Sequence, residues 1–287
     1  MSRVIYVNGL YKPYTEAAIH AEDRGFQFAD SIYEVIEVLG SKLIDEGRHL
    51  DRLARSLHEI QMLMPMSRAA LSFVIRETIR RNSVRDGIVY LQVSRGAGPR
   101  DFAFPDDSLP PTLVVIARQQ SQSKLAAQAE LGISVITMPD IRWSRSDIKS
   151  VMLLPACLAK AAAKTSGARE AWFTDASGFV TEGASSNAWI VTAEGALITR
   201  QLDQRILSGV TRAGVMDVAA AEGLKIEERA FTVAEALNAH EAFITSATNT
   251  VMPVVKIDGK TIGNGQPGAT TLRLRSAFHH IAEFRGH

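Results

Sequence analysis

The chain has 287 residues, of which 46% are hydrophobic and 22% are charged, and its formal net charge is +1. This composition is that of an ordinary globular protein, and the length allows two modest domains with real cores. Scattered basic residues and a net charge near zero give no electrostatic footprint for nucleic acid. No apolar run approaches the roughly 20 residues that span a bilayer. The composition argues against nucleic-acid and membrane functions and favours small neutral or zwitterionic partners.

The single cysteine, Cys157, excludes an intrachain disulfide and a cysteine metal cluster. The N-terminus begins Met-Ser-Arg-Val-Ile-Tyr and lacks the apolar core of a signal peptide, so a cytoplasmic location is expected. The sequence contains no Walker loop, internal repeat or clustered metal-ligand spacing. We therefore expect a cytoplasmic protein that uses neither a nucleotide-binding loop nor a metal.

The first 118 residues predict a small domain that mixes strands and helices. Short segments rich in Val, Ile and Leu predict strands, and apolar residues at helical spacing predict helices. The Gly/Pro-rich segment 95–105 predicts a long loop between two strands. By these patterns we expect strands at 4–7, 31–38, 87–94 and 112–116, and helices from His49 and after Ser67.

The polar segment that follows residue 118 lacks hydrophobic periodicity, and we place an interdomain linker at 119–127. Residues 1–118 then form the small N-terminal domain, and residues 128–287 form the larger C-terminal domain. The same patterns continue in the larger domain. We expect a strand at 133–138, strands that end in turns at 243–249 and 254–260, a strand, turn and loop over 171–187, and helices at 153–165, 211–221, from Thr232, and at 270–284.

Lys149 is the most informative residue, because it lies beside Asp147 and a run of apolar residues. A solvated lysine is protonated at neutral pH and cannot attack a carbonyl group. Partial burial destabilises the ammonium ion and exposes a nucleophilic amine. These surroundings are typical of a lysine that forms a Schiff base.

Glu182 lies in the segment Thr181-Glu-Gly-Ala-Ser185-Ser-Asn187, where small residues allow the backbone to approach a ligand closely. An ionised carboxylate could hold the pyridinium of a cofactor and keep it protonated, so that the ring accepts electrons. A solvated glutamate on a surface turn is the other interpretation of this segment.

Three segments could hold a phosphate group. In 207–212, Gly209 and Thr211 stand at the start of a helix, where free N–H groups and the helix dipole favour an anion. Plain capping by Thr211 is the alternative. Segment 246–249 could add hydroxyl and amide donors, or could simply form a turn. Arg52 could bind a phosphate bidentately, or could form a surface ion pair.

Two residues could contact a substrate. Tyr33 lies on the same strand face as Val35, so its hydroxyl could point into a pocket, although a core tyrosine is the commoner case. In the 95–105 loop, glycines and a proline could fix a turn that presents Arg100 to a carboxylate. An ordinary hairpin loop is the alternative for that segment.

Taken together, these segments resemble the class IV aminotransferases of fold type IV, which use pyridoxal 5′-phosphate, and among them the D-amino-acid transaminases. The resemblance runs nearly end to end, with several independent motifs in the family's order. These are Glu22-Asp-Arg-Gly-Phe-Gln-Phe28 before Tyr33-Glu-Val, His49-Leu-Asp-Arg52-Leu, Asp140-Ile-Arg-Trp-Ser-Arg-Ser-Asp-Ile-Lys149-Ser, Thr181-Glu-Gly-Ala-Ser-Ser-Asn187, Ile206-Leu-Ser-Gly-Val-Thr-Arg212 and Thr245-Ser-Ala-Thr248.

The resemblance implies an α+β protein with a small N-terminal α/β domain and a larger C-terminal domain that is barrel-like and carries helices. It implies a homodimer with active sites between the domains and near the subunit interface. The implied reaction moves the amino group of a D-amino acid, such as D-alanine, to a 2-oxo acid, such as 2-oxoglutarate. Because both half-reactions would share one site, the kinetics would be ping-pong.

The resemblance also implies a role for each candidate residue. Lys149 would be the catalytic lysine and proton shuttle, Glu182 would face the pyridine nitrogen, and Leu207 would support the ring. Arg100 would reach the neighbouring subunit's site. The remaining cofactor contacts would be Arg52, Ser185, Val210, Thr211, Ser246, Ala247 and Thr248, and the substrate contacts would be Tyr33, Glu37, Arg100 and Phe102.

Two positions depart from the family's pattern. D-specific members pair the arginine at position 100 with a histidine two residues on, where this chain has Phe102, and Glu37 stands where the type enzyme has a lysine. Losing a hydrogen bond to a charged group costs about 1.5–3 kcal/mol. Transamination of branched-chain L-amino acids or of (R)-amines, and aminodeoxychorismate lysis, stay open on the same fold. A cofactor-binding protein without turnover and a simple interaction module are the alternatives of a different class.

Overall fold

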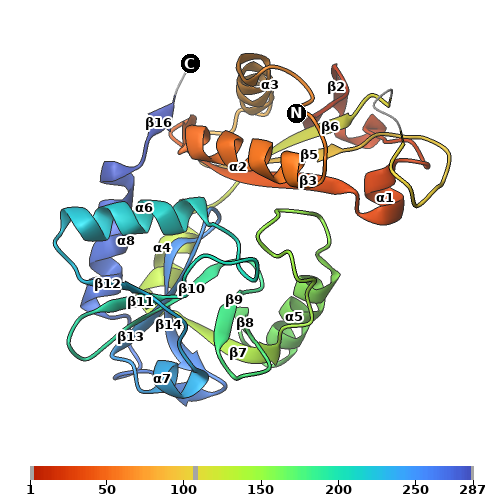
Figure 1. Ribbon diagram of the computed structural model, residues 1–287. Helices are drawn as coiled ribbons and strands as arrows, with labels where there is room; N and C mark the ends of the chain where they lie inside the picture. Colours follow the sequence, from red (N-terminus) through yellow and green to blue (C-terminus); the bar gives the residue numbers. More distant parts are fainter. Residues whose placement is uncertain (1–2, 106–108, 286–287) are drawn as a thin grey trace. The chain divides into compact units, whose positions relative to one another are not determined.

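The computed structural model describes residues 3–105 and 109–285, and the chain forms two compact units (Figure 1). Unit 1 consists of Met1–Gln122, Ile148–Met152 and Glu283–His287. Unit 2 consists of Ser123–Asp147 and Leu153–Ala282. The short segment that carries Lys149 therefore belongs to unit 1, although the residues on both sides of it belong to unit 2.

Unit 1 is built on a seven-stranded sheet with the order β16-β4-β3-β5-β6-β1-β2, in which all neighbours are antiparallel. β3 pairs with β5 along nearly its whole length, from Ser31 opposite Ser94 to Val38 opposite Gly87. The four strands predicted for this part of the chain are confirmed. The strands are β1 (Val4–Val7), β2 (Leu10–Pro13), β3 (Ser31–Leu39), β4 (Lys42–Ile44), β5 (Gly87–Ser94), β6 (Thr112–Gln119) and β16 (Phe284–Arg285).

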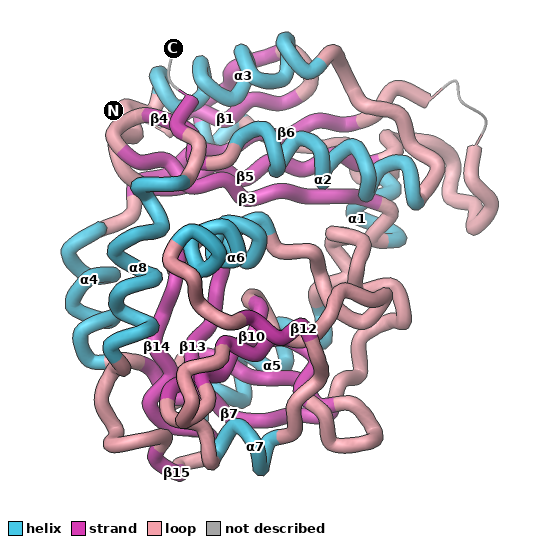
Figure 2. The backbone as a smooth tube through the Cα atoms, turned by 60° about the vertical axis from the view of Figure 1, so that its left-hand side comes forward, coloured by secondary structure: helices cyan, strands magenta, loops and turns pink. Residues whose placement is uncertain are grey.

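Helices α2 (Glu46–Glu59) and α3 (Arg68–Arg81) pack on this sheet, α2 against β3 and α3 against β1 and β6 (Figure 2). Both were predicted from the spacing of their apolar residues, because each buries one stripe. Ser67 caps α3 by accepting a hydrogen bond from the backbone N–H of Ala70. The short elements η1 (Tyr14–Glu16) and α1 (Arg24–Phe28) precede β3.

Unit 2 contains a nine-stranded mixed sheet with the order β12-β11-β10-β13-β14-β7-β8-β9, and β15 pairs with β14. The sheet curls around an apolar core that includes Trp172, Phe231, Ile190, Ile244 and Val135. The predicted barrel-like domain is thus confirmed. Its strands are β7 (Ile133–Pro139), β8 (Glu170–Thr174), β9 (Val180–Gly183), β10 (Asn187–Val191), β11 (Leu197–Thr199), β12 (Ile226–Glu228), β13 (Glu241–Ser246), β14 (Thr250–Ile257) and β15 (Lys260–Thr261).

Five helices belong to unit 2: α4 (Gln122–Leu131), of which only the first residue counts with unit 1, α5 (Leu154–Thr165), α6 (Val210–Ala221), α7 (Val233–Leu237) and α8 (Ala269–Ile281). α5 packs on β7 and β8, and α6 packs on α8 and β13. A Cβ atom at Gly214 of α6 would lie 2.7 Å from Phe278 of α8, so glycine permits this close approach. Within 3–105 and 109–285, no helix is long and apolar enough to cross a membrane.

The expected linker and the end of the last helix differ from the prediction. α4 begins inside the expected linker 119–127, and the boundary between the units follows Gln122. Ala129 is the buried residue of α4, so the helix lacks the apolar periodicity by which helices were predicted, although its Ala, Leu, Gln and Lys residues favour helix. The last helix ends at Ile281 rather than at residue 284, because Phe284 pairs with Ile44 in the sheet of unit 1.

Candidate functional site

The segment that carries Lys149 is attached to the open edge of β3. β4 pairs only with Val38 and Leu39, which leaves the start of β3 without a strand on that side. The backbone N–H of Tyr33 donates to the carbonyl of Lys149 at 3.0 Å, and that of Val151 donates to the carbonyl of Ser31 at 3.1 Å. These backbone bonds fix where the lysine leaves the main chain.

The side chain of Lys149 lies over an aromatic surface. Its Nζ is 4.4 Å from the centre of the Tyr33 ring, and Tyr33 stacks on Tyr90 with 5.7 Å between ring centres. The Tyr90 hydroxyl donates to Gln92 at 2.6 Å, and burial raises the pKa of Tyr90 to about 12. Tyr90 is therefore neutral at physiological pH. The structure brings Lys149 and Tyr33 together, as two of the predicted site residues.

The opposite face of β3 carries Glu34, whose side chain is fully buried. Glu34 accepts two hydrogen bonds from Arg52, at 2.7 Å from Nε and 2.8 Å from Nη2, and it contacts His49 Nδ1 at 2.8 Å. Burial would raise the pKa of Glu34, but the Arg52 and His49 side chains hold it at about 2. The carboxylate is therefore ionised throughout the physiological range.

Burial lowers the pKa of His49, and the charges of Arg52 and Lys149 add to this effect while Glu34 opposes it. His49 is therefore neutral at pH 7, and its proton must sit on Nδ1 in order to donate to Glu34. Arg52, a predicted phosphate contact, has its guanidinium fixed by Glu34 on this face. No role was predicted for Glu34 from the sequence. An acid between Ile32 and Ile36 on the buried face of a strand was the available signal.

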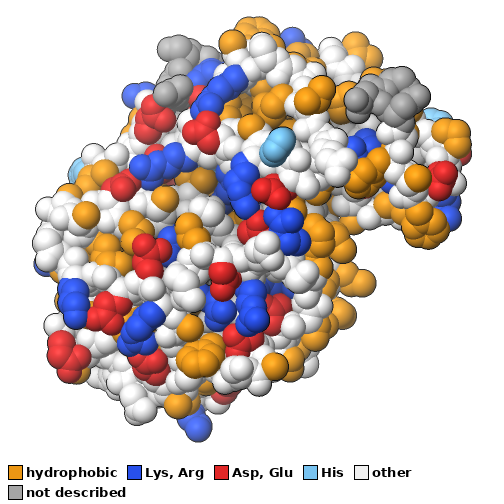
Figure 3. Space-filling model, in the orientation of Figure 1, with side chains coloured by type: hydrophobic (Ala, Val, Ile, Leu, Met, Phe, Trp, Pro, Cys, Tyr) orange, Lys and Arg blue, Asp and Glu red, His pale blue; other side chains and the backbone are white. Residues whose placement is uncertain are grey.

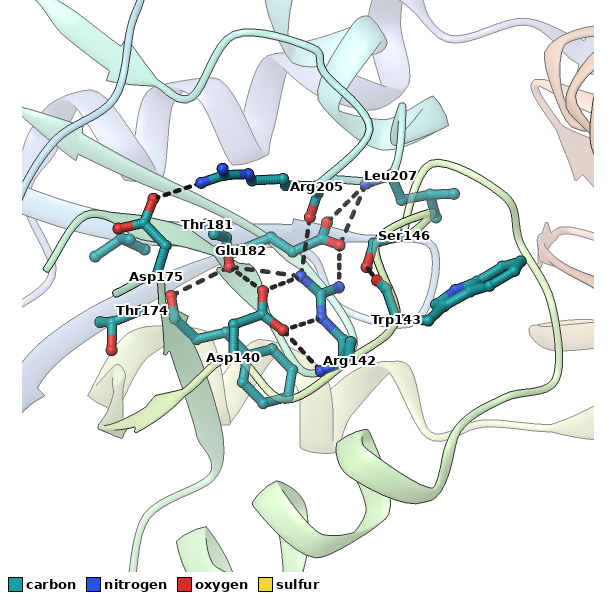
Figure 4. A network of polar contacts seen from close by, with 12 residues as sticks. Asp140, Arg142, Trp143, Ser146, Thr174, Asp175, Thr181, Glu182, Arg205 and Leu207 are labelled. Atoms are coloured by element: carbon teal, nitrogen blue, oxygen red, sulfur yellow. Dashed lines mark hydrogen bonds and ion pairs between the residues drawn. The ribbon is translucent and has the colours of Figure 1, made fainter. Parts of the chain in front are cut away.

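In unit 2, the carboxylate of Glu182 is the centre of a second network (Figure 4). It accepts hydrogen bonds from Arg142 Nη1 at 2.5 Å, from Asn187 Nδ2 at 3.0 Å, and from the backbone N–H of Leu207 at 3.1 and 3.2 Å. Glu182 is 5% exposed. A solvated glutamate on a surface turn is therefore the wrong interpretation of this segment.

Arg142 connects Glu182 to a second acid, Asp140. Arg142 donates to Asp140 from Nε at 2.9 Å and from Nη2 at 2.7 Å, and Thr181 Oγ1 donates to Asp140 at 2.8 Å. Burial would raise the pKa of Asp140, but the bonds from Arg142 and Thr181 lower it. Burial would lower the pKa of Arg142, but Asp140 and Glu182 raise it. No role was predicted for Asp140 or Arg142 from the sequence.

Helix α6 begins beside this network. Its first residue is Val210, and Gly209 precedes it without a side-chain cap. A Cβ atom at Gly209 would lie 2.0 Å from Oδ1 of Asn187, the residue whose amide binds Glu182. A side chain at position 209 would therefore displace Asn187. Because the helix starts at Val210, Thr211 lies inside the first turn, and the alternative interpretation that Thr211 caps the helix is wrong. Uncapped N–H groups and the helix dipole favour an anion.

Strand β13 ends close to the Glu182 network. Thr245 pairs with Asn187 in the sheet, so segment 246–249 leaves the strand close to the Glu182 network. Asn249 Nδ2 donates to Ser246 Oγ at 3.1 Å and to Thr248 Oγ1 at 3.3 Å, which orders the two hydroxyl groups. Ala247 lies between them and is half-buried.

Ser185 follows Glu182 closely in sequence but has a different partner. Its hydroxyl donates to Glu170 at 2.7 Å, and the Ser186 hydroxyl donates to the same carboxylate oxygen at 3.2 Å. Lys160 pairs with the other oxygen of Glu170 at 3.3 Å. The predicted contact of Ser185 with a cofactor stays a prediction.

The loop that carries Arg100 and Phe102 belongs to unit 1. The Arg100 guanidinium lies 5.1 Å from the ring centre of Phe28 and 5.5 Å from that of Phe102. Phe102 is 78% exposed, so an aromatic surface accompanies the arginine. Glu37, the other predicted substrate contact, is buried on β3 opposite Ile88. The predicted substrate contacts of Arg100, Phe102 and Glu37 stay predictions.

Each unit contains groups whose chemistry fits one part of pyridoxal 5′-phosphate. The cofactor presents a carbonyl carbon, a pyridine nitrogen and a phosphate dianion. The amine of Lys149 in unit 1 fits the carbonyl carbon. In unit 2, the buried carboxylate of Glu182 fits the pyridine nitrogen, and the uncapped start of α6 fits the phosphate. Over the described ranges, no group of three or more His, Cys, Asp or Glu side chains is placed to hold a metal ion.

Comparison with known proteins gives a consistent result. Residues 31–257 match the family model described as amino-transferase class IV. The chain is 37% identical over 281 residues to the D-alanine aminotransferase of Staphylococcus haemolyticus, covering 98% of each chain. It is 38% identical over 276 residues to the D-alanine aminotransferase of Bacillus licheniformis, covering 96% of each.

Solved structures share the fold. The branched-chain amino acid aminotransferase of Escherichia coli superposes with a TM-score of 0.88 at 22% identity, over 98% of this chain and 95% of that one. A second branched-chain amino acid aminotransferase, solved with pyridoxamine 5′-phosphate, superposes with a TM-score of 0.86 at 25% identity, over 98% of this chain and 94% of that one.

Proposed function

The chain belongs to the class IV aminotransferases, and from this we propose that it transfers the amino group of a D-amino acid, such as D-alanine, to a 2-oxo acid, such as 2-oxoglutarate. Its cofactor is pyridoxal 5′-phosphate. When bound, this cofactor supplies a carbonyl that accepts the amino group and a ring that takes up the electrons left on the substrate carbon. Near-full-length identity to relatives named D-alanine aminotransferase carries the proposal.

We assign the proton transfer to Lys149. Its Nζ would take the proton from the α-carbon of the substrate and pass it to the cofactor's carbonyl-derived carbon, which is general acid and base catalysis by one amine. The backbone bonds of Tyr33 and Val151 hold its segment on β3, and the Tyr33 ring supports its side chain. We also assign Tyr33 to contact with the substrate, because its ring lies beside that amine.

Glu182 keeps a proton on the pyridine nitrogen in this proposal. Arg142, Asn187 and the backbone of Leu207 fix its carboxylate, which is buried and cannot turn to water. The phosphate is held by Arg52, by the first turn of α6 at Val210 and Thr211, and by the segment Ser246, Ala247 and Thr248. Its dianion complements the N-terminal end of a helix dipole.

A second candidate function is transamination of apolar or branched-chain donors. Phe102 favours it, because an exposed ring beside Arg100 adds apolar surface where D-specific members have a histidine. Arg100 is assigned to the substrate carboxylate and Phe102 to the substrate side chain. Glu37 is assigned as an acidic residue near the entrance of the substrate site.

We also propose that the protein is a homodimer. Helix α5 exposes an apolar stripe at helical spacing, in which Leu154 is 70% and Leu158 is 53% exposed and Cys157 lies between them. Figure 3 shows hydrophobic side chains along the edge of the molecule where α5 lies in Figure 1. Replacing Leu158 by glutamate should lower the dimer fraction in analytical ultracentrifugation, whereas Lys164→Glu on the same helix should not. Equal sedimentation of the wild type and Leu158→Glu would reject this surface.

The test of the main proposal isolates one half-reaction. Purified holoenzyme is mixed separately with D-alanine and L-alanine without an oxo acid, and the absorbance of the cofactor is followed to its amine form. Conversion by the D-enantiomer alone supports the proposal. Conversion by L-alanine alone, or by neither, moves the assignment to the second candidate and calls for branched-chain and (R)-amine donors. Lys149→Ala should fold, as judged by circular dichroism, but should lose turnover.

A further inference from the structure

We infer that Asp140 is a positioning residue that acts through Arg142 to set how strongly Glu182 attracts the proton on the cofactor's ring nitrogen. The inference rests on the proposed function, because it deepens the role given there to Glu182. It assigns a task to a carboxylate that has no place in the proton transfer itself.

The guanidinium of Arg142 lies between two carboxylates (Figure 4). Its Nε and Nη2 form a two-bond fork with Asp140 at 2.9 and 2.7 Å, and its Nη1 donates to Glu182 at 2.5 Å. Arg142 therefore donates two hydrogen bonds to Asp140 and one to Glu182. Bidentate pairing is the stronger of the two geometries.

The charges of the three side chains decide what Glu182 offers a ligand. Glu182 paired with Arg142 alone would form a neutral pair with little attraction for a second cation. With Asp140 included, the three side chains carry one net negative charge when both acids are ionised. Asp140 thus balances Arg142, and the attraction of Glu182 for a proton is preserved.

The surroundings of the three side chains make this effect strong. Asp140 and Arg142 are each 13% exposed and Glu182 is 6% exposed at the side chain, so water and salt screen their interaction weakly. Thr181 holds Asp140, and the carbonyl of Arg205 accepts from Arg142 Nη2 at 3.0 Å. The geometry is therefore fixed before any ligand binds.

A second ion-pair group lies close by and provides the control. Asp175 pairs with Arg200 at 3.4 Å and with Arg205 at 3.2 Å, and it accepts backbone bonds from its own turn. Figure 4 shows Asp175 on the side of the network away from Leu207. If Asp140 only fixed its loop, as Asp175 fixes its turn, neutralising either acid would change folding stability and leave the cofactor unaffected.

The experiment compares Asp140→Asn holoenzyme with the wild type in two measurements. In the first, the absorbance of the bound cofactor is titrated with pH. We expect the apparent pKa of the cofactor's ring nitrogen, read from this absorbance, to fall by about one unit. We expect kcat to fall by about tenfold, since one pKa unit corresponds to a factor of ten. The KM for the oxo acid should stay within about twofold, because the phosphate and substrate contacts are untouched.

Asp175→Asn should titrate like the wild type. In an Arg142→Gln background, adding Asp140→Asn should produce a smaller further shift, since Asp140 has lost the arginine that connects it to Glu182. A wild-type titration for Asp140→Asn, an equal shift for Asp175→Asn, or a full further shift in the Arg142→Gln background would each overturn the inference. If the wild type showed neither cofactor absorbance nor amino transfer, the proposed function itself would fail.

A second variant covers the case in which Asp140→Asn does not fold. Thr181→Val removes the hydroxyl that donates to Asp140 at 2.8 Å and leaves every charge in place. The acid is then held less firmly, and the absorbance titration should shift in the same direction by a smaller amount. An unchanged titration in a folded Thr181→Val protein would contradict the inference.

Discussion

Two buried ion networks of this protein differ in their ratio of acidic to basic side chains. In unit 1, one carboxylate, Glu34, is shared by the guanidinium of Arg52 and the imidazole of His49. In unit 2, one guanidinium, Arg142, is shared by two carboxylates, Asp140 and Glu182. With a neutral histidine the first network has no net charge, whereas the second carries one negative charge when both acids are ionised. The first network fixes the position of an arginine, and the second presents a negative charge.

The acid at the centre of the unit 1 network is also more deeply buried than the side chains of the unit 2 network. The side chain of Glu34 is 0% exposed, whereas Asp140 and Arg142 are 13% exposed. Removing one partner of a deeply buried pair leaves an uncompensated charge in a medium of low polarity, and that costs more than the pair contributes. We therefore expect changes in the unit 1 network to act mainly on stability, and changes in the unit 2 network to act mainly on activity.

The largest expected effect is on stability, from Glu34→Ala. The substitution leaves Arg52 buried without its carboxylate and His49 without its acceptor, and it should lower the free energy of unfolding by about 3–5 kcal/mol. Urea denaturation followed by circular dichroism measures this loss. Glu59→Gln is the control on α2, since its pair with Arg55 is partly exposed at 4.0 Å and should contribute less than about 1 kcal/mol. Equal losses in the two variants would remove the basis of the comparison.

Acid should destabilise unit 1 in two steps. The pKa of His49 is below its ordinary 6.5, so the unfolded chain takes up the proton first, and stability falls as pH drops below 6.5. Glu34 has a pKa of about 2 in the fold against an ordinary 4.5, so its contribution is present above pH 4.5 and is lost as pH falls toward 2. This second step amounts to about 3 kcal/mol.

Unfolding free energies measured at several pH values test both steps. His49→Gln should remove the first step and retain the second, because the glutamine amide can still donate to Glu34 without taking up a proton. A wild-type stability that stayed constant from pH 7 to pH 5 would contradict the assignment of the first step to His49.

The parts of the fold that were predicted correctly are those whose burial leaves a pattern. β3, α2 and α3 alternate or repeat because one side of each meets the core. β10 was not predicted as a strand, since all five of its residues, Asn187–Val191, are buried and no alternation marks it. α4 was missed for the opposite reason, because Ala129 alone is buried in it and no apolar stripe results.

The residues of the candidate site were also predicted or missed according to whether they leave a local pattern in the sequence. Lys149 and Glu182 were singled out because their own neighbours in the sequence are unusual. Arg142 could not be assigned, since its partner Glu182 lies 40 residues away and a pairing at that distance leaves no local pattern. Glu34 could have been found, because a charged residue between Ile32 and Ile36 on a buried strand face needs a partner.

The smallest expected effect comes from Asn187→Ala in unit 2. The substitution removes the hydrogen bonds from Asn187 to Glu182 and to the carbonyl of Leu207, both at 3.0 Å, and leaves the bonds from Arg142 and from the N–H of Leu207 to Glu182. One lost bond to a charged group corresponds to about 1.5 kcal/mol, or about tenfold in kcat, with stability nearly unchanged. The matched control is Asn238→Ala, whose amide donates to a helix carbonyl at 3.0 Å in an exposed position. If Asn187→Ala lost stability as Glu34→Ala does while keeping its kcat, the two networks would serve the same purpose, and the charge of the second would have no part in the reaction.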